Sequence, residues 1–536
     1  MRRTLLLLLL TALAAIPAAA QTRLTYDKMS PSDRSRMERA VQDYTKGRYR
    51  PSADELRKLS VLYPDNPDIY FYLGLNAVKR NFNVAGIRRY FPQVLKLNPR
   101  YPDAVAHYYM GLIHYTDEQY DQAEDDFKRY FELANNAGTP QNDALYMEAS
   151  NYLYWSQFLA EAYRNMAPFD PRVVPGLSSP DDEAMPFFTL DGTQCFLLRA
   201  TSTDNRTTFY TRELAPKKLM LYSSQRHDTL FRDPRLLKAP FNQGDPEGGV
   251  TLTADNNELL YPVIRRFRGY NNSDIYLTRR DSNGWQPIAN AGDSVNGADS
   301  WESQPSITPD GQWLYFASNR AGGCGGTDIW RCHRKTDGTW GKAENLGSAV
   351  NSPGNERCPF IHADGHTLYF SSNGWQGFGG YDMYFIDLDR PDHTKPVNLG
   401  LPLNTEDDDI ALGITPDGTH AYYAGRTAGP DRVGGTDILQ FELYPAARPE
   451  AMTLVRGRVV APNGTPLPAT VSVGHGSPTP ALYHADSQGR YTILLSATRP
   501  NTLTLAAPGH RSATLTLPPC SGGATLPPPT ITLQRQ

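Results

Sequence analysis

The sequence has little cysteine and none of the residue patterns that are typical of a catalytic or metal centre. Five cysteines, Cys195, Cys324, Cys332, Cys358 and Cys520, are too sparse for a disulfide scaffold and lack the spacing of a zinc site. No His-Glu-x-x-His, Gly-x-Ser-x-Gly or phosphate-loop pattern occurs. The sequence therefore predicts no catalytic residue, no metal ligand and no cofactor. Cys324 and Cys332 flank one predicted strand, and both a disulfide and two free thiols remain open for them.

Basic residues are also fewer than acidic ones. The sequence has 53 Lys and Arg and 57 Asp and Glu, which gives a formal net charge of −4. A nucleic-acid-binding domain normally carries a strong basic footprint. The charge therefore argues against nucleic acid as a partner.

Long apolar runs are missing except at the N-terminus. The run from Leu5 to Ile16 follows Arg2 and Arg3 and precedes a small-residue stretch that ends at Ala20. This order predicts a secretory signal peptide over residues 1–20. The run is shorter than the about 20 residues that span a bilayer, so we expect an exported protein with no direct membrane span.

Residues 24–168 have apolar residues at helical spacing, with a final helix near Ala144 to Arg164. Ala40, Gly74 and Gly111, spaced by 34 and 37 residues, are predicted as the small residues where paired helices touch. The segment resembles a tetratricopeptide array of about three repeats, which implies an α-solenoid.

Tyrosines are dense in this helical segment. Amphipathic rings suit a binding groove, so one interpretation is a partner groove. The alternative, which we favour, is packing between helices. The candidate groove residues are Tyr70, Tyr72, Tyr108, Tyr109 and Tyr115.

Residues 178–446 repeat a strand-rich unit. Aspartates in a Gly-x-Asp-like turn recur at intervals of 54, 54 and 55 residues, and two other marks keep the same period. Such a period is typical of a β-propeller, whose blades must stack to bury their faces. The turn aspartates are Asp274, Asp328, Asp382 and Asp437; Asp-Gly precedes a strand at Asp310, Asp364 and Asp417; a loop asparagine recurs at Asn242, Asn296, Asn351 and Asn404.

The apolar strands predict five blades, and a sixth around Lys217 to Arg235 remains open. Pro305 to Gly311 and Gly325 to Ile329 resemble the WD-like repeat of the TolB family of periplasmic propellers. We interpret the repeated aspartates as caps of turn amides. Trp285 and Trp340, 55 residues apart, keep the period and are interpreted as blade packing, with sugar stacking as the alternative.

Residues 453–536 alternate short strands and turns, including Val455 to Val460 and Asp486 to Ile493. Their order, closed by Pro508-Gly509-His510, resembles the carboxypeptidase regulatory-like domain, which implies a small β-sandwich without catalytic residues.

The complete order resembles Bacteroidetes envelope proteins of the PorE type, associated with type IX secretion. In those proteins an OmpA-like domain follows, whereas this sequence has none before Gln536. The resemblance implies a multidomain α plus all-β protein that acts as a non-catalytic scaffold in the periplasm, associated with the outer membrane. Expected partners are outer-membrane or secretion components and peptidoglycan-associated proteins. The alternative function is a glycan-binding or hydrolytic propeller that uses its central channel.

Overall fold

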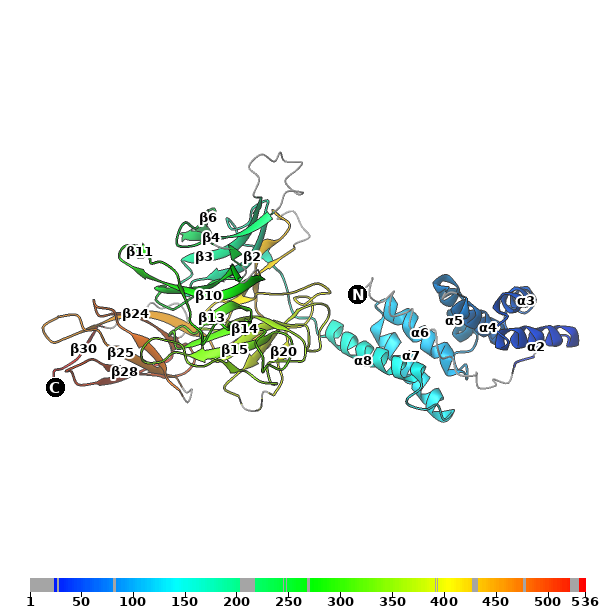
Figure 1. Cartoon of the computed structure of the whole chain (residues 1–536). Helices are drawn as coiled ribbons and strands as arrows, with labels where there is room; N and C mark the ends of the chain where they lie inside the picture. Colours follow the sequence, from blue (N-terminus) through cyan, green and yellow to red (C-terminus); the bar gives the residue numbers. More distant parts are fainter. Residues whose placement is uncertain are drawn as a thin grey trace. The chain divides into compact units, whose positions relative to one another are not determined.

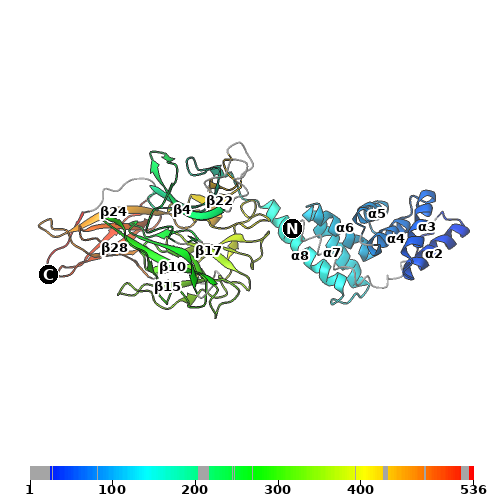
Figure 2. The same ribbon diagram turned by 45° about the horizontal axis from the view of Figure 1, so that its top comes forward.

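The computed structural model describes residues 24–536 except 27, 81–82, 203–216, 244, 247, 268–269, 391, 393, 427–431, 476–478 and 521–529. The predicted signal peptide, residues 1–20, lies outside the described residues. The chain divides into two compact units between Met166 and Ala167. Figures 1 and 2 show helices in the first unit and strands in the second.

The first unit contains seven helices among its described residues. They are α2 (Pro31–Thr45), α3 (Tyr49–Leu62), α4 (Pro67–Lys79), α5 (Val84–Leu97), α6 (Ala104–Thr116), α7 (Tyr120–Asn136) and α8 (Ala144–Arg164). Side chains of Asn66, Asp103 and Asp143 accept N–H groups of the following first turns, which fixes where these helices begin. The predicted final helix is α8.

Two glycines allow paired helices to touch, as predicted. A Cβ on Gly74 would lie 2.8 Å from the Phe91 ring, and a Cβ on Gly111 would lie 2.8 Å from the Phe127 ring. Both phenylalanines are fully buried. Because each ring occupies the space that a methyl group would need, α4 packs on α5 and α6 packs on α7 at close range.

The second unit begins with five antiparallel sheets. The first has β2 (Asp182–Phe188), β3 (Gln194–Ser202), β4 (Lys217–His227) and β5 (Leu230–Phe231), with β6 (Arg235–Leu236) on β4. The second has β11 (Gly284–Trp285), β10 (Tyr270–Asp281), β9 (Glu258–Phe267) and β7 (Asp245–Pro246), with β12 (Ala289–Asn290) on β10 and β8 (Thr251–Leu252) on β9.

The third sheet has β13 (Glu302–Ile307), β14 (Trp313–Ser318), β15 (Asp328–His333) and β16 (Glu344–Asn345). The fourth has β17 (Glu356–Ile361), β18 (Thr367–Ser372), β19 (Asp382–Asp387) and β20 (Val397–Asn398). The fifth has β1 (Arg172–Val173), β23 (Asp437–Glu442), β22 (His420–Gly425) and β21 (Gly413–Ile414). The stretch from Lys217 to Arg235 belongs to the first sheet and forms no sheet of its own.

Shared apolar clusters join each sheet to the next. Leu260 of the second sheet packs with Phe316 of the third in one such cluster. Leu197 of the first sheet shares another with Ile438 of the fifth, and β1 pairs with β23 through Arg172 and Gln440. The five sheets therefore close into a ring, which we call the five-sheet ring (strands β1–β23).

The loop asparagines fasten the outer edge of four sheets. Asn351 Oδ1 accepts the Ile329 N–H at 2.8 Å, and its Nδ2 donates to the Ile329 carbonyl at 3.1 Å. Asn242, Asn296 and Asn404 bond Leu221, Ile275 and Met383 in the same two-way manner. The repeated asparagine thus replaces a strand neighbour where the fourth strand is too short.

Two small sheets follow the ring. One has β27 (Arg490–Ser496), β24 (Met452–Val460) and β30 (Thr530–Thr532); the other has β26 (Ala481–His484), β25 (Thr470–Gly474), β28 (Asn501–Ala506) and β29 (Ala513–Leu517). Val459 and Ile493 of one sheet and Val471 and Leu505 of the other share one buried core. We call this two-sheet element the C-terminal sandwich; Figures 1 and 2 show it (orange to red) against the five-sheet ring.

Candidate functional site

The turns between the first two strands of each sheet lie at the end of the ring that carries the C-terminal sandwich. In the third sheet Asp310 Oδ1 accepts the Thr308 hydroxyl at 2.7 Å and the Gln312 N–H at 3.1 Å, which closes the turn. Its other oxygen accepts the N–H of Leu482, in sandwich strand β26, at 3.0 Å. One carboxylate thus shapes the turn and holds the sandwich.

Other turns of the ring make equivalent contacts with the sandwich. Asp191 of the first sheet pairs with Arg456 of β24 at 2.6 Å. Pro416, beside Asp417 in the fifth sheet, accepts the Met452 N–H at 2.8 Å. Ala254 of the second sheet is part of the sandwich core. The end of the ring that carries the predicted Asp-Gly turns is therefore the surface that contacts the sandwich. Sequence reasoning missed this role because the contacting residues are far apart in the sequence.

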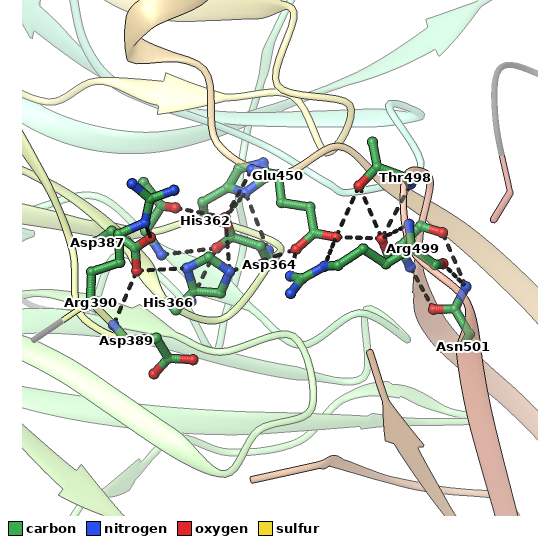
Figure 3. Close-up of polar contacts among 12 residues, drawn as sticks. His362, Asp364, His366, Asp387, Asp389, Arg390, Glu450, Thr498, Arg499 and Asn501 are labelled. Atoms are coloured by element: carbon green, nitrogen blue, oxygen red, sulfur yellow. Dashed lines mark hydrogen bonds and ion pairs between the residues drawn. The ribbon is translucent and has the colours of Figure 1, made fainter. Parts of the chain in front are cut away.

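The turn of the fourth sheet carries the densest polar contacts (Figure 3). Asp364 is buried; it accepts the His366 and Thr367 N–H groups at 3.0 and 2.9 Å and the Glu450 N–H at 3.2 Å. Burial alone would raise the pKa of Asp364, but the nearby His362 and His366 and the Thr367 hydroxyl hold it well below its ordinary value.

Glu450 extends this network into the sandwich. Its Oε1 accepts the Arg499 Nε–H at 2.8 Å, and its Oε2 lies 3.8 Å from His366 Nε2. His366 Nδ1 in turn lies 3.0 Å from Asp387. The network (Figure 3) joins a ring turn, the connecting segment and the β27–β28 turn by charge-assisted bonds.

The inner strands of the ring enclose a narrow cavity. Met185, Gln304 and Cys358, each from the inner strand of one sheet, and Ala411, two residues before β21, have positive φ values between 51° and 64°. These residues and their neighbours line a cavity of about 60 Å³, well below the roughly 300 Å³ at which small-molecule pockets typically begin. Burial raises the pKa of the Cys358 thiol to about 12, so this thiol is protonated at neutral pH.

An acidic residue lies at or shortly before the inner strand of four sheets, and sequence reasoning missed it; Glu183, Glu302 and Glu356 are buried, and Asp409 is half-buried. Glu302 accepts the Ser300 and Ser318 hydroxyls at 2.6 Å, and Glu356 accepts those of Ser352 and Ser372 at 2.6 Å. Glu183 and Asp409 bond Ser179 and Thr405 in the same way. The sequence pattern that could have revealed these residues is an acidic residue six positions before the Thr or His of four Thr-x-Asp or His-x-Asp turns.

The repeated turn aspartates bond nearby amides. Asp328 accepts the Gly325 N–H at 3.0 Å, Asp382 the Phe378 N–H at 2.9 Å, and Asp437 the Gly434 N–H at 3.1 Å. Asp274 instead bonds the side-chain amides of Asn272 and Asn290. All four thus stabilise local loops.

Four of the five candidate groove tyrosines do not line an open groove, which corrects the groove interpretation for them and agrees with the packing alternative. Tyr72, Tyr108, Tyr109 and Tyr115 are buried, and only Tyr70 is half-buried. Tyr109, for example, stacks on Phe91 with ring centroids 4.6 Å apart. The rings fill the space between helices because interhelix packing buries more apolar area than a solvent-facing groove.

The periodic tryptophans pack within the ring. Trp340 is buried beneath the Arg334 guanidinium, 4.2 Å from its ring centre, and Trp285 packs half-buried against Phe241. Cys324 and Cys332 are free thiols, one exposed and one buried.

Within the described part of the chain, no group of three His, Cys, Asp or Glu side chains is arranged to hold a metal ion. Every helix there is too short or too polar to cross a membrane. Chemically, the side chains gathered at the ring turns are arranged to hold a second domain in place.

Comparisons with known proteins gave similarity to solved structures alone, since no family model and no curated protein matches the chain. The Sgt2 tetratricopeptide domain from Aspergillus fumigatus is 15% identical, with a TM-score of 0.20, over 26% of this chain and 88% of that one. An oligogalacturonate lyase from Vibrio parahaemolyticus is 10% identical, with a TM-score of 0.28, over 53% and 99%. An α-L-arabinofuranosidase from Lactobacillus brevis is 12% identical, with a TM-score of 0.29, over 49% and 90%.

Proposed function

We propose that this protein is a non-catalytic scaffold, exported to the periplasm, that holds outer-membrane or secretion components together. In this proposal the helical unit is a tetratricopeptide-like solenoid that docks the partner, and the five-sheet ring is a five-bladed propeller. A type IX secretion-related assembly and peptidoglycan-associated proteins are the partner classes that we propose from the sequence resemblance.

The observation that carries the proposal is a set of exposed apolar side chains on the helical unit. Val61 and Leu62 at the end of α3 are 80% and 56% exposed, and Met147 and Tyr154 of α8 are 54% and 52% exposed. Val61 and Leu62 are adjacent in the sequence, and neighbouring exposed apolar side chains mark a candidate contact surface for another protein. The repeated aspartates of the ring give further support, because they accept hydrogen bonds from nearby loop amides and so stabilise the ring itself.

The test is affinity purification of tagged protein from crosslinked envelopes. A Val61→Asp, Leu62→Asp variant should lose the recovered envelope proteins, because charges replace the exposed apolar contact. Val433→Asp, at a site 48% exposed on the ring unit, is the matched control and should keep them. Equal recovery by all three proteins would overturn the docking role of α3. Retention of glycan without protein would favour the glycan-binding alternative.

A further inference from the structure

A second, larger cavity lies where the first and fifth sheets meet sandwich strand β24. Its volume is about 360 Å³, within the typical range of small-molecule pockets, roughly 300–1,000 Å³. Residues 187–192 of the first sheet, 413–417 of the fifth and 452–454 of β24 supply most of its wall, together with Arg226, Phe231, Phe360 and Tyr422.

The wall of this cavity is largely aromatic. Phe188 stacks on Tyr422 with ring centroids 3.9 Å apart, and Phe231 meets Phe188 edge-on at 5.5 Å. All three rings and Phe360, which also lines the cavity, are half-buried, so part of each ring remains accessible. A ligand that covers these rings needs an apolar body of its own.

The three charged side chains at the rim differ in whether they form an ion pair. Asp191 is paired with Arg456 at 2.6 Å, and Asp417 accepts the Thr419 N–H at 3.0 Å and the Thr415 hydroxyl. Arg226 is exposed and forms no ion pair with any residue in the described ranges; its guanidinium lies 5.9 Å from the Phe231 ring centre. Arg226 is therefore the cation that this rim offers to a ligand, while Asp417 remains an ionised, hydrogen-bonded carboxylate in the same wall.

Tyr422 supplies a neutral polar group next to this charge. Burial raises the pKa of its phenol, and the nearby Arg226 opposes that shift. The hydroxyl is therefore protonated at neutral pH and does not neutralise the guanidinium.

We propose that this cavity binds a small apolar monocarboxylate, with its body against the aromatic wall and its carboxylate on Arg226. Arginine is well suited to this task, because its planar guanidinium binds a carboxylate through two parallel hydrogen bonds. The inference does not depend on the scaffold function, since it concerns a cavity of the ring and sandwich and no surface of the helical unit.

Calorimetric titration of the full chain with 4-phenylbutyrate, and with 4-phenylbutanamide as its uncharged counterpart, tests the proposal. We expect saturable binding of one acid per chain and at least tenfold weaker binding of the amide. Arg226→Gln should lose this preference, whereas Arg226→Lys should keep part of it. Arg89→Gln is the matched control, because Arg89 also lies over a ring, 5.7 Å from the centre of Tyr90 in the helical unit, and should bind as the wild type does.

Filling the cavity should abolish binding of both compounds. A Cβ on Gly413 would have only ordinary contacts, 3.7 Å from Pro186 O and 4.0 Å from Phe360, so Gly413→Leu fills the space from the ring. Leu454→Trp fills it from the sandwich, and each variant is first checked for native circular dichroism. Equal affinity for acid and amide, unchanged binding in Arg226→Gln, absence of saturable binding, or unchanged binding in a folded filling variant would each overturn the proposal.

Discussion

The side chain of Asn351 forms both backbone hydrogen bonds of a strand neighbour with Ile329, at 2.8 and 3.1 Å. A third bond, 3.0 Å from its Nδ2 to Asn345 Oδ1, orients the amide. Ile329 is fully buried, so water cannot replace the missing strand. The same relation at Asn242, Asn296 and Asn404 makes the repeated asparagine a structural element of each of these sheets.

Replacing Asn351 by alanine should lower the free energy of unfolding of the ring by about 2–4 kcal/mol, because two buried backbone groups lose their partners. Chemical denaturation followed by tryptophan fluorescence measures this. Asn463→Ala is the control, since Asn463 is exposed and its side chain accepts the Thr465 N–H at 3.1 Å. An equal effect of both changes would contradict the role given to Asn351.

Gly111→Ala should destabilise the helical unit by about 1–3 kcal/mol, because the new methyl group would overlap the Phe127 ring. Adding Phe127→Leu should recover part of the loss, and a double-mutant cycle measured by thermal unfolding gives the coupling. Additive effects would show that α6 and α7 do not touch at this pair.

Stability of the ring should fall as pH rises from about 5 to 7 at the contact between the fourth and fifth sheets. Burial raises the pKa of Asp382 to about 6 and that of Asp409 to about 6, the latter also through the proximity of Asp382 and Asp407. A raised carboxyl pKa means that the folded state binds more protons, so stability is greatest below the unfolded pKa and is lost through pH 6.

Asp409→Asn should reduce this pH dependence and leave the part due to Asp382, because the amide stays neutral and keeps an oxygen for the Thr405 N–H. The melting temperature measured from pH 5 to 7.5 tests this, with Asp299→Asn as the exposed control. The opposite contribution of Asp364, whose pKa is lowered, is lost only below about pH 4. A wild-type melting temperature that rises over pH 5 to 7 would contradict the prediction.

Glu450→Ala should loosen the C-terminal sandwich from the ring, because Arg499 and His366 lose their shared carboxylate. Faster proteolytic cleavage in the segment between residues 444 and 452 is the expected result. Glu442→Ala is the matched control: Glu442 also pairs with an arginine, Arg448 at 2.7 Å, but its side chain is 74% exposed. Cleavage at the wild-type rate would show that Glu450 does not hold the sandwich.

One thiol should react rapidly with 5,5′-dithiobis-(2-nitrobenzoate) in the native protein. Cys324 is exposed, whereas the other four cysteines are buried. Burial raises the pKa of Cys332 to about 12; burial, Asp328 and Glu356 also raise the pKa of Cys324, so its faster reaction depends on its exposure. Cys324→Ser should abolish the rapid phase. A rapid phase that appears only after reduction would indicate a disulfide instead.

The sequence by itself determined the local features of this protein. Helix ends at Asn66 and Asp143, turns at Asp310 and Asp364, and the close helix contact at Gly111 depend on residues within about 20 positions of one another. Their spacing and chemistry are readable because a turn or a helix pair repeats the same local geometry.

Tertiary structure alone decided what these features do together. Asp310 meets Leu482 172 residues away, and Asp191 meets Arg456 265 residues away; no local pattern marks such partners. Burial likewise decided that Tyr108 and Tyr109 pack between helices, since a tyrosine suits both a core and a groove. Closing the ring set Arg226 beside Tyr422, because only the meeting of the first and fifth sheets brings β4 and β22 to one cavity.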